Sequence, residues 1–270
     1  MGRGIAELAA GTGFETILFD LNPQVLVDAQ NTIHQHLNIQ VEKGKITTDE
    51  QDAFFKRLSF TIDPQECSAE LVIEAIVESM EAKANLFNLL TPVNGSNTIF
   101  ASNTSSLSIT ELATYIQYPE RVAGLHFFNP PVFMKLVEIV KGPETSDGTI
   151  SELRELCLQM NKTAVVCNDS PGFIVNHVAR TYYLEALYLV EKELADINTL
   201  DRLMEQSGFK MGPFRLMDLI GNDINYAVSC SVYEALGKPE RLKPSGLQKE
   251  KVVSGALGKK TGNGYYNYPL

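Results

Sequence analysis

The chain has 270 residues, of which 44% are hydrophobic and 21% charged, an ordinary composition for a globular protein. Its 23 basic and 33 acidic residues give a formal net charge of −10, which argues against nucleic acid as the main partner because phosphate binding needs a basic surface. The chain has no apolar stretch long enough to span a bilayer and no signal peptide, and its four cysteines form no metal-ligand cluster, so we expect no membrane contact, reduced thiols and a location in the cytosol or, after cleavage, in an organelle matrix.

The chain opens with a helical pattern that starts at once. Residues 1–11 are predicted to form a helix, and residues 15–21 a strand with Asp20 near its end. Thr48 and Gln51 have the spacing of a capping box. The periodicity predicts further helices over residues 23–39, 48–58, 79–90 and 149–160, and strands over residues 58–62, 71–75, 98–102, 122–128, 136–140 and 163–167. This alternation indicates a parallel α/β sheet.

The pattern changes after the turn Asp169-Ser170-Pro171-Gly172. Residues 173–256 show helical periodicity and no convincing strand, and residues 173–190 form the longest helix candidate. We therefore predict two domains: residues 1–168 as a doubly wound, Rossmann-like α/β domain, and residues 169–270 as an all-helical domain.

The first helix and strand match the second half of a dinucleotide-binding unit. In such a unit a helix follows a glycine turn, and the next strand ends in an acid that binds the adenosine ribose. Gly2 fits the third glycine of G-x-G-x-x-G, because Asp20 follows it after 18 residues. An aspartate there accepts both ribose hydroxyls and repels a 2′-phosphate, so NAD is favoured over NADP. Each of the two residues is also common at such positions without a nucleotide.

On this interpretation the first strand of the unit and its first two glycines are missing from the chain. That strand lies at the centre of a doubly wound sheet, and the loss of its buried side chains would cost roughly 8–15 kcal/mol. The whole stability of a domain is about 5–15 kcal/mol. We therefore expect the natural protein to continue about a dozen residues before Met1. The chain as written should fold poorly or bind nucleotide weakly.

Three polar residues form a candidate catalytic site. Ser105 lies in a polar loop after a predicted strand, where open α/β sheets bind ligands. His126 lies near the end of another strand, and Glu138 lies inside an apolar strand 12 residues later. If these strands are antiparallel, the carboxylate can orient the imidazole, whose other nitrogen can then take a proton from an alcohol. Taken alone, His126 could equally be a histidine with a structural hydrogen bond.

Seven further segments carry a recognisable pattern: residues 74–78 (EAIVE), 101–106 (ASNTSS), 126–130 (HFFNP), 136–138 (LVE), 169–176 (DSPGFIVN), 211–214 (MGPF) and 258–262 (GKKTG). Together they resemble the L-3-hydroxyacyl-CoA dehydrogenase family, particularly the short-chain 3-hydroxybutyryl-CoA dehydrogenases. The resemblance runs from Met1 to Tyr268. Arg215 departs from it, because relatives often carry an acid at this position.

The resemblance implies roles for individual residues. His126 matches the catalytic base and Glu138 its orienting partner, while Ser105 and Asn176 match the residues that hydrogen-bond the 3-oxygen of the substrate. The implied cofactor site consists of Gly2, Asp20, Ile76, Glu78, Lys83, Ser105, Asn129 and Lys260. Lys43, with His36 nearby, falls in the helical arm that touches CoA in the family. From the residues alone, Glu78 could instead cap the following helix, and Lys83 could lie on a solvated helix face.

The implied reaction interconverts (S)-3-hydroxyacyl-CoA and 3-oxoacyl-CoA with NAD, and the helical domain is expected to form a homodimer and part of the acyl pocket. Two alternatives remain open. One is a dehydrogenase of sugar acids on the same fold. The other is a catalytically silent, crystallin-like protein, which the incomplete nucleotide loop would favour.

Overall fold

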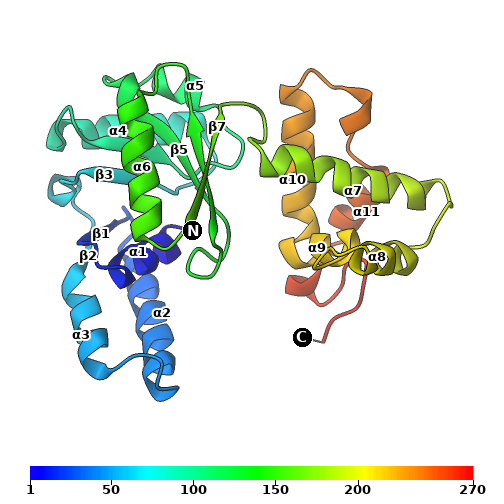
Figure 1. The fold of residues 1–270 in the computed structure, drawn as a ribbon, viewed down its shortest axis with the longest axis horizontal. Helices are drawn as coiled ribbons and strands as arrows, with labels where there is room; N and C mark the ends of the chain where they lie inside the picture. Colours follow the sequence, from blue (N-terminus) through cyan, green and yellow to red (C-terminus); the bar gives the residue numbers. More distant parts are fainter. Residues whose placement is uncertain (270) are drawn as a thin grey trace. The chain divides into compact units, whose positions relative to one another are not determined.

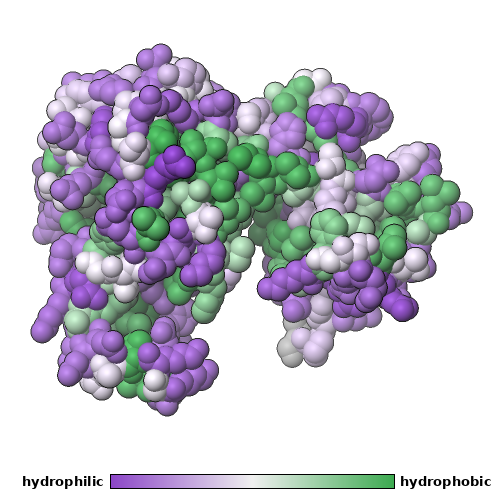
Figure 2. Space-filling view, in the orientation of Figure 1, coloured by the Kyte–Doolittle hydropathy of each residue, from purple (hydrophilic) through white to green (hydrophobic). Residues whose placement is uncertain are grey.

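The computed structural model describes residues 1–269, and these residues divide into two compact units, which Figure 1 shows. The first unit is Met1–Asp169, and the second begins at Ser170. No helix in the described part of the chain is long and apolar enough to cross a membrane. Figure 2 shows hydrophilic residues spread over much of the visible face of each unit.

The first unit is an α/β structure whose strands form two sheets. One sheet pairs β1 (Thr16–Phe19) with β2 (Leu58–Thr61) in parallel. The other has the order β3-β4-β5-β6-β7, and only its β5–β6 pair is antiparallel. Its strands are β3 (Leu71–Glu74), β4 (Ile99–Ser102), β5 (Val122–Phe127), β6 (Leu136–Lys141) and β7 (Thr163–Asn168). The doubly wound α/β prediction is thereby confirmed.

Helices cover the strands of this unit. They are α1 (Gly2–Gly11), α2 (Pro23–Glu42), α3 (Thr48–Arg57), α4 (Met80–Leu90), α5 (Ile109–Ala113) and α6 (Asp147–Gln159). Every residue of β4 and β5 is buried, which explains why these strands are apolar except at Ser102 and His126 rather than alternating. Ile5 and Leu8 of α1 and Leu153 of α6 pack with them in one apolar core. This core fixes the strand ends at which the polar loops begin.

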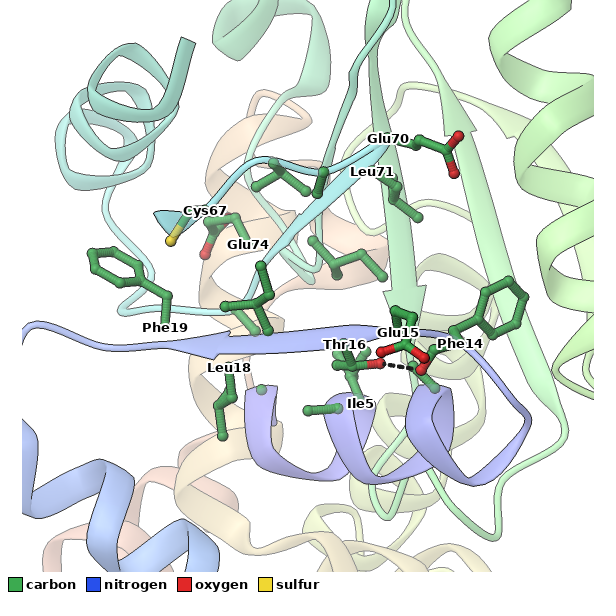
Figure 3. Close-up of a pocket in the computed structure, with 18 of the residues that line it drawn as sticks. Ile5, Phe14, Glu15, Thr16, Leu18, Phe19, Cys67, Glu70, Leu71 and Glu74 are labelled. Atoms are coloured by element: carbon green, nitrogen blue, oxygen red, sulfur yellow. Dashed lines mark hydrogen bonds between the residues drawn. The ribbon is translucent and has the colours of Figure 1, made fainter. Parts of the chain in front are cut away.

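A large hollow separates the two sheets. β1 and β3 do not pair with each other, and Figure 3 shows them on either side of a pocket whose floor includes α1. The hollow has a volume of about 1220 Å³ and is lined by residues of α1, β1, β3 and α6. It lies between β1 and β3, where the sequence pattern predicts a further strand of a doubly wound sheet.

The capping box of α3 lies one residue earlier than predicted. The hydroxyl of Thr47 accepts a hydrogen bond from the Glu50 amide, and the Glu50 carboxylate accepts one from the Thr47 amide at 2.7 Å. The predicted pair, Thr48 and Gln51, is therefore wrong, because the charged side chain of Glu50 is the stronger acceptor. Gln51 instead donates to Asn38 at 2.7 Å.

The second unit is helical, as predicted. It contains α7 (Val175–Glu191), α8 (Ile197–Gln206), α9 (Pro213–Ile220), α10 (Asn222–Ala235) and α11 (Gly246–Val253). Its described residues form no strand, only isolated bridges near the C-terminus. The first helix begins two residues later than predicted, because Gly172 and Phe173 have φ angles of 77° and 50°, which a right-handed helix cannot contain.

Candidate functional site

The carboxyl ends of β3, β4 and β5 meet at one edge of the five-stranded sheet. Asn103, the first residue after β4, joins the three ends: its amide donates to the Glu74 carbonyl at 2.8 Å, and its side-chain oxygen accepts from the Phe127 amide at 2.8 Å. Sequence reasoning missed this role, although an amide side chain directly after a buried strand is a usable signal. The polar loop that follows is thereby anchored where α/β sheets bind ligands.

His126 and Glu138 face each other across the antiparallel pair of β5 and β6. The two residues are direct register partners, so their side chains lie on the same face of the sheet. Nδ1 of His126 lies 2.7 Å from Oε2 of Glu138, and the two residues are only 6% and 1% exposed. The buried carboxylate holds the ring with Nδ1 toward it, so Nε2 is the nitrogen on the side of the ring away from Glu138.

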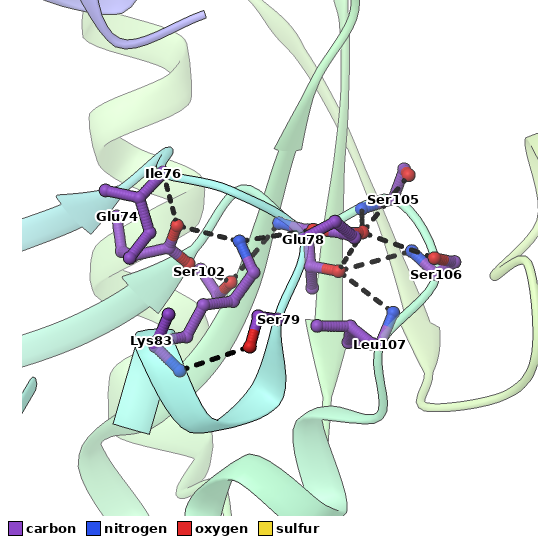
Figure 4. Close-up of polar contacts among 11 residues, drawn as sticks. Glu74, Ile76, Glu78, Ser79, Lys83, Ser102, Ser105, Ser106 and Leu107 are labelled. Carbon is purple, nitrogen blue, oxygen red and sulfur yellow. Dashed lines mark hydrogen bonds and ion pairs between the residues drawn. The ribbon is translucent and has the colours of Figure 1, made fainter. Parts of the chain in front are cut away.

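The carboxylate of Glu78 holds the loop that carries Ser105, as Figure 4 shows. Its Oε1 atom accepts from the Thr104 hydroxyl at 2.6 Å, from the Ser105 amide at 3.0 Å and from the Ser105 and Ser106 hydroxyls at 3.3 and 3.2 Å. Its Oε2 atom lies 3.2 Å from the ammonium of Lys83. Glu78 does not cap the following helix; the side chain of Ser79 does so.

Lys83 is buried, so the alternative that it lies on a solvated helix face is wrong. It is 1% exposed, and its ammonium donates to Oε1 of Glu74 at 2.7 Å. The same carboxylate also accepts from the Ile76 amide at 2.6 Å and from the Ser102 hydroxyl at 2.6 Å. Glu74 was part of a segment that carried the resemblance, but sequence reasoning gave it no role.

Competing effects set the pKa of Glu78. Burial alone would raise it, but the Thr104 hydroxyl, the charge of Lys83 and the Ser105 amide together lower the pKa below its usual value of 4.5. All of these partners favour the ionised form. Glu78 is therefore a carboxylate at neutral pH and keeps the loop hydrogen bonds.

The predicted nucleotide residues lie at the start of α1 and at the ends of β1 and β3. Gly2 is the first residue of α1, where a helix presents unpaired backbone N–H groups, and it lies close to Ala75. Asp20 directly follows β1, half-buried, and its carboxylate accepts from the Asn22 amide at 2.8 Å. Ile76 and Asn129 follow β3 and β5 and are exposed. An acid for the ribose and a helix N-terminus for the pyrophosphate fit NAD.

Two predicted residues belong to the second unit. Asn176 lies in the first turn of α7, where its carbonyl accepts from Nε of Arg180 at 3.1 Å. Lys260 donates to both oxygens of Asp223, at 2.6 and 2.7 Å.

Arg215, the departure from the family pattern, has a local explanation: its guanidinium lies 4.5 Å from the centre of the Tyr266 ring and 3.7 Å from Glu205.

The expected CoA arm consists of α2 and α3. Lys43 is the C-cap residue of α2 and is exposed. His36 lies on the same helix, and its Nδ1 is 3.2 Å from Oε2 of the buried Glu7 in α1. The structure thus ties α2 to α1, the helix that begins at Gly2.

Comparisons with known proteins agree with this geometry. Residues 1–170 match the family described as the NAD binding domain of 3-hydroxyacyl-CoA dehydrogenase, and residues 172–268 match its C-terminal domain. The chain is 46% identical over 99% of its length to a 3-hydroxyadipyl-CoA dehydrogenase of Escherichia coli, of which it spans 57%. It is 39% identical to a probable 3-hydroxybutyryl-CoA dehydrogenase of Bacillus subtilis, of which it spans 94%.

Solved structures show the same fold. A 3-hydroxybutyryl-CoA dehydrogenase from Escherichia coli superposes with a TM-score of 0.96 at 46% identity, covering 99% of this chain and 57% of the other. The (S)-3-hydroxybutyryl-CoA dehydrogenase from Ralstonia eutropha superposes with a TM-score of 0.95 at 32% identity, covering 100% of this chain and 96% of the other.

Proposed function

Because the chain belongs to the 3-hydroxyacyl-CoA dehydrogenase family, we propose that it interconverts (S)-3-hydroxyacyl-CoA and 3-oxoacyl-CoA with NAD and that it acts on short acyl chains. The names of its relatives support a short acyl chain as substrate. The protein spans only 57% of the length of the Escherichia coli relative. The buried contact between Nδ1 of His126 and the Glu138 carboxylate is the observation that carries the catalytic part of this proposal.

In the proposed mechanism His126 is the general base. Its Nε2 takes the proton of the 3-hydroxyl group, and the Glu138 carboxylate stabilises the positive charge that forms on the ring. The Ser105 hydroxyl and the Asn176 amide hold the substrate oxygen as it becomes a carbonyl. NAD, when bound, supplies the acceptor for the hydride from C3. In the reverse direction the protonated His126 returns its proton to the alkoxide.

The residues proposed to hold NAD are spread along the sheet edge and the second unit. Asp20 would bind the adenosine ribose, and the first turn of α1 at Gly2 would face the pyrophosphate. The remaining positions are Ile76, Glu78, Lys83, Ser105, Asn129 and Lys260. Lys43 would contact the CoA part of the substrate, for which a cationic side chain suits the phosphates.

The substitution His126→Gln tests the catalytic assignment. We expect kcat to fall by at least about 10²-fold, because general-base catalysis contributes about that much or more. The affinity for NADH, measured by fluorescence titration, should stay within about twofold, because the ring acts on the substrate. His34→Gln is the matched control, since His34 stacks on Phe55 away from this edge. Near-normal turnover of His126→Gln would remove the assignment.

A longer acyl group is the second candidate substrate. The relative from Escherichia coli that is 46% identical is named a 3-hydroxyadipyl-CoA dehydrogenase, which implies a substrate with a terminal carboxylate. Values of kcat/KM for 3-hydroxybutyryl-CoA and 3-hydroxyadipyl-CoA, measured side by side, decide between the two. Gulonate is the control substrate for a sugar-acid dehydrogenase, and we expect no turnover of it.

A homodimer formed through the helical unit is the proposed assembly. The unit exposes large apolar side chains, including Val178, Leu194, Leu203 and Val253, and exposed apolar surface often marks an interface. Light scattering coupled to gel filtration would give a dimer mass at micromolar concentration. The expected cytosolic location stays a prediction.

A further inference from the structure

A buried carboxylate, Glu74, collects hydrogen bonds from three directions at the end of β3. Its Oε1 accepts from the Ile76 amide at 2.6 Å and from Nζ of Lys83 at 2.7 Å, while its Oε2 accepts from the Ser102 hydroxyl at 2.6 Å. Glu74 and Lys83 are each 1% exposed. A buried ion pair is a costly way to gain stability, and apolar residues often do as well. The geometry of the Glu74–Lys83 ion pair, rather than its contribution to stability, therefore indicates its role.

Lys83 bridges two carboxylates of different character. On one side is Glu74, fully enclosed, and on the other is Glu78, whose side chain is 39% exposed. The ammonium lies 2.7 Å from Glu74 and 3.2 Å from Glu78. The shorter contact and the enclosed partner mean that Glu74 sets the position of the ammonium. Glu78 then takes its position from Lys83.

Glu78 passes this position on to the catalytic loop. One of its oxygens faces Lys83, and the other accepts from the Ser105 amide and from the hydroxyls of Thr104, Ser105 and Ser106. A shift of the carboxylate toward Lys83 would weaken the bonds on its other side. Figure 4 shows the continuous chain of contacts from Glu74 to Ser105.

We propose that Glu74 is a positioning residue for the dehydrogenase reaction, acting through Lys83 and Glu78 to fix the Ser105 loop. This rests on the proposed function only for its catalytic consequence. Without the charge of Glu74, the ammonium has a single anionic partner and moves toward Glu78, so that the carboxylate turns from the loop. The Ser105 hydroxyl then loses the place from which it meets the substrate oxygen.

Glu74→Gln separates charge from shape, because the amide keeps a similar size and can still bond Ser102 and the Ile76 amide. We expect amide hydrogen exchange of residues 103–107 to become about 10-fold faster, since the loop loses protection. We expect kcat with acetoacetyl-CoA and NADH to fall about 10- to 100-fold with KM nearly unchanged, because a misplaced group acts mainly in the transition state.

Phe100→Leu is the stability-matched control. Phe100 is buried in β4, and its apolar ring packs against Phe87. It should lower the melting temperature while leaving kcat and exchange of residues 103–107 within about twofold of wild type at 25 °C. If Phe100→Leu and Glu74→Gln lose equal stability and speed up hydrogen exchange of residues 103–107 equally, Glu74 is a structural residue and the proposal is wrong.

A double variant tests the route and remains readable if Glu74→Gln fails to fold. Glu74→Gln with Lys83→Met removes both buried charges and leaves neither unpaired. Because Glu74 acts through Lys83, the double variant should match Lys83→Met alone within about twofold, both in kcat and in the hydrogen exchange of residues 103–107. Effects that multiply would overturn the route.

Hydrogen exchange makes the two proposals separable. If the wild-type protein does not reduce acetoacetyl-CoA, the proposed function fails, but exchange of residues 103–107 still reports whether Glu74 holds the loop. If the enzyme is active and the loop of Glu74→Gln stays protected, only the positioning proposal fails.

Discussion

The side chain of Glu78 makes its hydrogen bonds as a charged acceptor, so its contribution depends on pH. A group whose pKa is lower in the folded state stabilises the fold above its unfolded pKa and loses this contribution as the pH falls through its folded pKa. The pKa of Glu78 is lowered because its hydrogen bonds and Lys83 outweigh its burial. Its stabilisation is therefore complete at neutral pH and absent in strong acid.

The substitution Glu78→Gln should remove this dependence. We expect the free energy of unfolding at pH 7 to fall by about 1–2 kcal/mol, a value reduced for the partial exposure of the carboxylate. The difference from wild type should shrink in acid, once the pH has fallen through the lowered pKa of Glu78, because the wild-type side chain is then protonated too. Urea unfolding at both pH values measures it. Glu81→Gln, an exposed acid in the first turn of the following helix α4, is the control and should change stability little at either pH.

For single residues, the sequence was informative where the chemistry of the side chains and their spacing along the chain indicated the same contact. A histidine and a glutamate 12 residues apart, around two prolines, predicted the His126–Glu138 pair from the geometry of a hairpin. The burial of Lys83 could not be predicted in the same way. Whether a helix face meets solvent depends on what packs against it, and the carboxylate that receives Lys83 lies nine positions away in a different element.

The turn between β5 and β6 is held by one lysine from another part of the chain. Nζ of Lys162 donates to the carbonyls of Pro131 at 2.5 Å and Met134 at 2.8 Å, and the residue is 7% exposed. Burial and the nearby charge of Lys135 lower the pKa of Lys162. The turn contains two prolines, which have no N–H to donate, so the lysine supplies donors that the turn lacks.

Lys162→Met should loosen the turn. We expect a loss of about 2–3 kcal/mol in the free energy of unfolding, because the carbonyls of Pro131 and Met134 lose a charged donor. Thermal unfolding followed by circular dichroism measures this loss. Lys135→Met is the matched control, since Lys135 is exposed and the hydrogen bond from its ammonium to the Asn161 carbonyl is long at 3.4 Å. Equal effects of the two substitutions would contradict the assigned role of Lys162.

Helices and strands that are long or fully buried were easier to predict from the sequence than short ones. The strands β4 and β5 were found because all their residues are buried and all but Ser102 and His126 are apolar. The ends of the elements were less certain: α2 continues to Glu42, three residues past its predicted end, with no glycine or proline to stop it earlier. The short helix α5 was missed, because five residues are too few to show a period.

The division of the sheet is the main feature of the whole α/β unit. The hollow between β1 and β3 is lined by apolar residues of α1 and of both strands, such as Ile5, Leu18 and Leu71. Its volume of about 1220 Å³ exceeds that of an ordinary small-molecule pocket, about 300–1,000 Å³. The helix α1 and the acid-ended strand β1, which border this hollow, were predictable from the sequence, whereas its volume was not.

An added strand should fill the hollow. We expect an extension of about five apolar residues and a glycine turn before Met1 to raise the melting temperature by at least about 10 °C, because it buries apolar surface between two sheet edges. NADH should also bind more tightly. An extension of equal length with serines in place of the apolar residues is the control. Unchanged melting with the apolar extension would show that the hollow does not accept a strand.

The separation of β1 and β2 from the other strands has a further consequence for how the unit opens. A two-stranded ribbon is marginal by itself, so this pair and the helices α2 and α3 form the part with the weakest tie to the rest of the sheet. Such a part behaves as a separate cooperative segment that opens before the whole unfolds. Limited proteolysis should thus cleave first between residues 12 and 70, and any ligand that contacts the ends of both β1 and β3 would clamp the two bodies together and slow the cut.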